Sequence, residues 1–188
     1  MPHAATHATD PIRCALRMYW LLPAAFLVHD TEELFTVPSW VVAHRSQLAD
    51  FARRAGLSED AVDRLPASLS AFAGAVAILL VLFLGVTWGA TRTRGRGPLQ
   101  FVFALLLGGF FVHGFTHLGQ ALFFGGYTPG SVTAAVVVIP ASLYLYVRLF
   151  RAHLLTRKTA IVAALLGIAC FLPATVLALA VGSWLNPH

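Results

Sequence analysis

Charged side chains are scarce in this sequence. Asp, Glu, Lys and Arg make up 11% of its 188 residues, whereas hydrophobic residues make up 58%. A soluble globular domain carries about 25% charged residues. The low share of charge therefore excludes an ordinary soluble domain and indicates an integral membrane protein.

Cysteine is also scarce, since the chain contains only Cys14 and Cys170. The first lies at the start of one apolar run and the second in the middle of another, so we expect no structural disulfide. No repeat and no linker divides the chain. We therefore expect residues 1–188 to form a single membrane domain.

The sequence lacks the interleaved arginine and aromatic residues that line a nucleic-acid groove. Its net charge of +5 comes from basic loops separated by long uncharged runs, which is the pattern of polytopic membrane proteins. We therefore expect the lipid bilayer as a partner and exclude nucleic acid, while a homodimer stays open.

Five apolar runs approach or exceed the length that crosses about 30 Å of hydrocarbon at about 1.5 Å per residue. We predict an all-α bundle of five transmembrane helices, with a short amphipathic helix in the connection 37–66. The predicted spans are 14–36, 67–90, 99–124, 131–147 and 159–184.

The distribution of Lys and Arg predicts the orientation. The N-terminal tail, the second loop and the fourth loop are basic, the third loop has no base, and the four bases of the first loop face four acids. By the positive-inside rule, the N-terminus is expected in the cytoplasm and the C-terminus outside.

A cluster of ionisable residues, His29-Asp30-Thr31-Glu32-Glu33, ends the first apolar run. Each charge within a bilayer costs roughly 2.5–3.5 kcal/mol on insertion scales. No base follows in the next ten residues, so the acids need a partner from another segment, a bound cation or protons. On a helix, His29, Glu32 and Glu33 share one stripe.

The third predicted span carries a second motif, His113-Gly114-Phe115-Thr116-His117, with two histidines four residues apart. Such a pair can bind one metal ion. In the predicted topology, both motifs lie between the midplane and the outer end of their spans. We therefore predict a shared divalent-metal site of His29, Glu33, His113 and His117, with zinc first and iron or manganese as alternatives.

Four further polar residues are candidates for hydrogen bonds that hold the ligands in place, although ordinary bonding between helices is an equal alternative. They are Asp30, Thr116, Gln120 and Tyr127.

The motifs resemble those of the bacterial H-x-x-E-E membrane proteins, a family of unknown function. The resemblance rests on His29-Asp-Thr-Glu32-Glu33, His113-Gly-Phe-Thr-His117 and the turn Tyr127-Thr-Pro129-Gly130. It implies a bacterial inner-membrane protein with a suspected metal site, in which these histidines and glutamates act as a unit. It implies no reaction.

The leading functional hypothesis is a metal-dependent hydrolase acting on a lipid or other apolar substrate near the outer interface, with Glu32 and Glu33 as candidate catalytic residues. One alternative is a metal-free acid–base isomerase or binding protein for a sterol-like or polyprenyl ligand. Another is a proton- or cation-coupled transporter, which five spans without internal symmetry fit poorly. A purely structural role for the polar groups is disfavoured by the cost of burying several charges.

Overall fold

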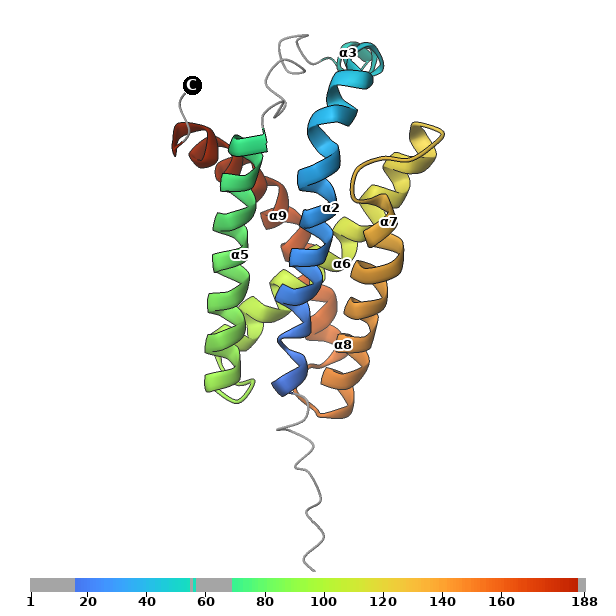
Figure 1. The fold of residues 1–188 in the computed structure, drawn as a ribbon. Coiled ribbons are helices and arrows are strands. Elements are labelled where there is room, and N and C mark those ends of the chain that lie inside the picture. The colour runs from blue at the N-terminus through green and yellow to red at the C-terminus, as the bar shows by residue number, and fades with distance from the viewer. Residues whose placement is uncertain (1–15, 55, 57–68, 186–188) are drawn as a thin grey trace, which may run out of the picture.

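The computed structural model describes residues 16–54, 56 and 69–185, and these form an all-helical bundle (Figure 1). The described residues do not include Cys14, the first two residues of the predicted spans that begin at 14 and 67, or residues 55 and 57–66 of the predicted amphipathic connection. Cys170 is an exposed free cysteine. The helices are α2 (Leu21–Ala43), α3 (Arg45–Arg54), α5 (Leu69–Arg92), α6 (Pro98–Phe123), α7 (Ser131–Thr133), the π-helical turn η1 (Ala134–Val138), α8 (Ile139–Arg151) and α9 (Arg157–Leu185).

Three helices of the described part are long and apolar enough to cross a membrane, whereas the sequence predicted five spans. They are Phe72–Arg92, Pro98–Phe123 and Ser131–Arg151. The helix α2 does not qualify because Asp30, Glu32 and Glu33 lie within four residues of its middle. The helix α9 has 29 residues, but the side chains of several residues after Cys170 lie outside the description. The three apolar helices suggest a membrane protein.

The helix α2 does not end at residue 36, where the first span was predicted to stop. It continues through Pro38 to Ala43, and α3 follows almost at once. Proline in a helix interior removes one backbone hydrogen bond and crowds the carbonyl of the residue four positions earlier, so α2 must be stabilised here by other contacts. The hydroxyl of Thr36 donates to the carbonyl of Glu32 at 2.7 Å, so this turn has an additional bond within the helix.

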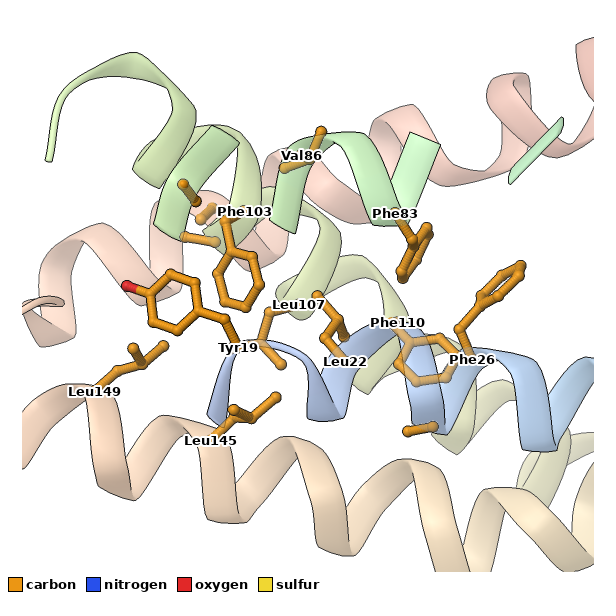
Figure 2. Packing of buried hydrophobic residues seen from close by; sticks show 14 of the residues in the cluster. Tyr19, Leu22, Phe26, Phe83, Val86, Phe103, Leu107, Phe110, Leu145 and Leu149 are labelled. Carbon is orange, nitrogen blue, oxygen red and sulfur yellow. The ribbon is translucent and has the colours of Figure 1, made fainter. Parts of the chain in front are cut away.

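The core lies where α2, α5, α6 and α8 meet (Figure 2). The rings of Phe26 and Phe83 stack with centroids 4.4 Å apart, and those of Tyr19 and Phe103 with centroids 4.2 Å apart. Leu145 of α8 is fully buried beside them. Large buried side chains from four helices therefore hold the orientation of α2 relative to α6.

Small residues allow α9 to pack closely against α6. A Cβ atom on Gly108 would lie 2.5 Å from the Cα of Ala164, and one on Gly167 would meet the carbonyl oxygen of Leu105. Small residues at helix contacts are typical of membrane bundles, because they let two backbones approach. This contact leaves the opposite side of α6 to face α2 and α7.

Candidate metal centre

The candidate site lies on the same face of α2 that packs into the core. Tyr19, Leu22 and Phe26 are buried at spacings of three and four residues, and the same spacing then reaches His29 and Glu33. Residues at this spacing share one face of a helix. Packing of the apolar residues against α6 and α8 therefore also aims His29 and Glu33 into the bundle.

The helix α6 carries the matching stripe. Phe103, Leu107 and Phe110 are fully buried, and the same spacing leads through Gly114 to His117. A Cβ on Gly114 would lie 3.0–3.1 Å from the side chains of Ile139 and Val138, which shows how closely η1 and α8 approach α6 here. The two stripes meet, so His117 faces α2.

The side chains of His29, Glu33, His113 and His117 converge where these two helix faces meet. One nitrogen or carboxylate oxygen from each of them lies within 4.8 Å of those of the others. The Nε2 of His117 lies 3.2 Å from Oε1 of Glu33 and 2.8 Å from Nε2 of His113, and the Nε2 of His29 lies 4.0 Å from the same glutamate oxygen. Two ligands of one ion with bonds of about 2.1 Å can be at most about 4.2 Å apart. These three distances meet that condition, while the remaining pairs are bounded by 4.8 Å, slightly more than one ion can span without a small movement of the side chains.

Hydrogen bonds from the turn determine which nitrogen of His117 faces the centre. Its Nδ1 lies 2.8 Å from the carbonyl oxygen of Pro129. A carbonyl only accepts, so Nδ1 must donate, and in a neutral imidazole Nε2 then carries the lone pair. That lone pair points toward His113 and Glu33.

The same reasoning applies to His29. Its Nδ1 lies 2.8 Å from Oγ1 of Thr133, and that hydroxyl lies 3.4 Å from the carbonyl of Gly130, to which it can only donate. The hydroxyl therefore accepts from Nδ1 of His29, and Nε2 is left with its lone pair. Among the described residues, this buried Nε2 has no hydrogen-bond partner.

The centre thus brings two imidazole lone pairs to a carboxylate, and the N–H that must point inward is that of His113, which donates to Nε2 of His117. Lone pairs of His29 and His117 face a carboxylate oxygen of Glu33 at 4.0 and 3.2 Å, and the side chains of these three residues are only 1–12% exposed. Such groups repel one another in a medium of low dielectric constant. A cation at the centre would turn this repulsion into attraction.

Gly130 closes one side of the centre. Its φ is +78°, a conformation that favours glycine. A Cβ at this position would lie 2.8 Å from Cε1 of both His29 and His117, and 2.9 Å from Oε1 of Glu33. The backbone of the turn 127–130 therefore lies directly against three of the four converging side chains.

Glu32 points to the turn and not to the four-residue centre. Its Oε1 accepts from the hydroxyl of Tyr127 and its Oε2 from the backbone N–H of Thr133, both at 2.8 Å. Partial burial, with a further contribution from Glu32, raises the pKa of the Tyr127 phenol, so the phenol remains a donor at neutral pH. Because Thr133 also accepts from His29, Glu32 acts on the centre through the turn.

The other residues that were predicted to support the ligands differ in what they contact. Tyr127 bonds Glu32 as described, whereas the hydroxyl of Thr116 donates to the carbonyl of His113 on its own helix at 2.7 Å. Gln120 lines a neighbouring cleft. Asp30 is buried, but it is not one of the four converging residues.

Sequence reasoning did not identify Thr133 as a supporting residue, although it bonds both His29 and Glu32. The sequence feature that could have identified Thr133 is its position one turn after Pro129-Gly130, at the beginning of the fourth predicted span. A hydroxyl there can reach the N-terminal end of the helix and whatever packs against it.

Glu32→Ala should weaken metal binding about 10–100-fold, as is typical when a group that orients ligands is lost. The substitution removes the acceptor for Tyr127 and for Thr133, and thereby loosens the turn. Glu32→Gln keeps one acceptor oxygen and should weaken binding less. Competition with a chromogenic chelator measures these affinities.

Thr116→Ala is the matched control, because its hydroxyl bonds only the carbonyl of His113 among the bonds that the structure gives it. Its metal affinity should be unchanged. Equal affinities of the wild type and Glu32→Ala would contradict the role of Glu32 in positioning the turn, and complete loss of metal would make Glu32 a ligand.

Comparison with known proteins places these residues within one family. The family described as "Protein of unknown function with HXXEE motif" matches residues 20–145, which include both histidine motifs and the turn 127–130. No curated protein and no solved structure matches the chain.

Proposed function

The chain belongs to the HXXEE family of proteins of unknown function, and we propose that it is a metal-dependent integral membrane enzyme. The proposed reaction is hydrolysis of a lipid or other apolar substrate near the outer interface. The observation that carries this proposal is the convergence of three imidazoles and one carboxylate at a buried point on α2 and α6.

The proposal includes five spans in one membrane domain, residues 1–188. A bound cation would offset the carboxylates of α2 and let this helix cross the bilayer as a fourth span, and α9 would be the fifth. The proposed location is a bacterial inner membrane, and the basic loops support an N-terminus in the cytoplasm and a C-terminus outside.

His29, His113 and His117 are the proposed ligands. Three neutral imidazoles are the ligand set of one class of catalytic zinc site, and iron or manganese would also accept this set with a carboxylate. The backbone of Pro129 and the hydroxyl of Thr133 support the assignment, since they leave Nε2 of two imidazoles free of protons. A bound divalent metal would polarise a carbonyl group and acidify a water molecule.

Glu33 is the proposed general base. Its Oε1 lies beside His117, and the residue also lines a largely apolar cleft, so it can contact both the metal and a substrate. Glu33 would take a proton from water as the water oxygen bonds the carbonyl carbon. It would return the proton to the leaving oxygen or nitrogen when that bond breaks.

Elemental analysis of the detergent-purified protein tests the proposal. The wild type should hold about one zinc, iron or manganese ion per chain, as a mononuclear site requires. His113→Ala/His117→Ala should hold none, because two ligands are lost. His44→Ala is the control, since His44 ends α2 outside the converging group and bonds the carbonyl of Trp40.

Metal-free wild-type protein, even after zinc, iron and manganese are supplied during expression, would overturn the proposed metal chemistry. The apolar cleft beside Glu33 would then favour an acid–base isomerase or a binding protein for an apolar ligand.

A further inference from the structure

A cleft of about 600 Å³ opens beside the four-residue centre. This volume lies within the range of about 300–1,000 Å³ that is typical of small-molecule sites. Glu33, His113 and His117 line the cleft, and most of the remaining lining is apolar. The cleft therefore joins the reactive groups to a hydrocarbon-like environment.

The cleft is elongated and runs along two helices. On α2 its lining extends from Glu33 to Val41, and on α6 from His113 to Phe123. At 1.5 Å per residue these stretches are about 12 and 15 Å long. The ionisable lining residues occupy one end of both stretches, so the cleft has a polar end at the metal centre and an apolar end away from it.

Aromatic rings and the amphipathic helix α3 form the apolar end. Phe51 of α3 meets Phe123 with ring centroids 5.5 Å apart, and Trp40 meets Phe124 at 5.0 Å. Phe72 of α5 also lines the cleft. Phe51 and Phe123 are 46% and 63% exposed, so an apolar chain at this end would cover ring surface between α3 and the end of α6.

Charge limits the group that can lie at the polar end. Among the described residues that line the cleft, Glu33 is the only one with a carboxylate, and no lysine or arginine lines it. A phosphate or a free carboxylate placed inside would face Glu33 with no arginine or lysine in the lining, and only the proposed metal ion would offset the repulsion. A neutral ester or amide has no such penalty.

We infer that the cleft binds the single hydrocarbon chain of a neutral lipid-like ester or amide, with its carbonyl at Glu33 and the chain end at Phe51 and Phe123. This inference rests on the proposed hydrolase function and names its substrate class. It assigns selection for the hydrocarbon chain of the substrate to α3 and to the part of α6 that ends at Phe123.

Gly119 offers a way to fill the cleft without disturbing the metal centre. It lines the cleft, and a Cβ at this position would meet nothing within 4 Å. Gly85 of α5 is a matched control, because its Cβ would also meet nothing and it does not line the cleft. Gly119→Leu and Gly85→Leu each place a better helix former in a helix interior.

The test is photoaffinity labelling of the full-length protein in detergent, with dodecanamide that carries a diazirine on its terminal carbon. Wild-type protein and Gly85→Leu should be labelled in the peptides that contain Phe51 and Phe123. Labelling should fall at least tenfold in Gly119→Leu, because leucine occupies the volume of the chain. Unmodified dodecanamide should compete for the site, whereas butanamide should not.

Labelling spread over outward-facing residues such as Val81, or labelling unchanged in Gly119→Leu, would overturn the chain site. Metal analysis of the same samples separates this inference from the metal proposal. Metal present with unselective labelling refutes only the chain site, and selective labelling of a metal-free wild type supports the chain site while refuting the metal chemistry.

Discussion

Gly130→Ala should abolish metal binding although it adds a single methyl group outside both α2 and α6. The methyl carbon would lie 2.8 Å from Cε1 of His29 and His117, and 2.9 Å from Oε1 of Glu33. Carbon atoms pack at about 3.5–4.0 Å, so the turn or both imidazoles must move. Either shift breaks the convergence of the ligands, and elemental analysis should find less than a tenth of the wild-type metal.

Gly125→Ala separates this clash from backbone strain. Gly125 also has a positive φ, +68°, but a Cβ there would meet nothing within 4 Å. Alanine at this position should cost about 1–2 kcal/mol of stability from its conformation alone and leave the metal content unchanged. Equal metal loss in both variants would show that strain in the turn, and not contact with the ligands, disturbs the site.

Glu33→Gln should lower the hydrolysis rate by about 10²–10⁴, the usual contribution of a general base. Glutamine is nearly isosteric with glutamate but cannot accept the proton of water. The three histidines remain in the variant, so its metal content should stay near that of the wild type. Hydrolysis of a chromogenic dodecanoyl ester, together with elemental analysis, measures both quantities.

Glu33→Asp provides the control because it keeps a carboxylate at a slightly different position. It should retain more activity than Glu33→Gln at the same metal content. If Glu33→Gln lost its metal, Glu33 would be a ligand and not the base. If it kept both metal and full activity, the proposed role of Glu33 in proton transfer would be wrong.

The long apolar helices were the easiest part of the fold to anticipate. Hydrocarbon excludes unpaired backbone groups, so long apolar runs such as those of α5 and α6 form helices whatever surrounds them. The end of α2 was harder, because a helix that passes through Pro38 depends on the packing of the residues beyond the proline. The structure continues α2 to Ala43 and places α3 directly afterwards.

Spacing along the helices also indicated which histidines lie together. His113 and His117 must project from one face of any helix, as must His29 and Glu33. What spacing could not tell was whether the two faces meet. That depends on the packing of Phe26 and Phe83 and of their neighbours on α6, which orients both helices.

The different surroundings of Glu32 and Glu33 show the limit of the sequence most clearly. Both lie within one turn of His29, so periodicity treats them as equivalent candidates. In the structure Glu33 faces the histidines, whereas Glu32 bonds Tyr127 and Thr133, about a hundred positions away.

The sequence by itself determined an apolar, helical chain with two His-containing motifs, because helix formation and side-chain periodicity depend on neighbours within one or two turns. Only the tertiary structure decided which atoms converge, which imidazole nitrogens face inward, and that the backbone of Gly130 closes the centre. These features depend on contacts between residues distant in sequence, and such contacts are formed only when the helices pack.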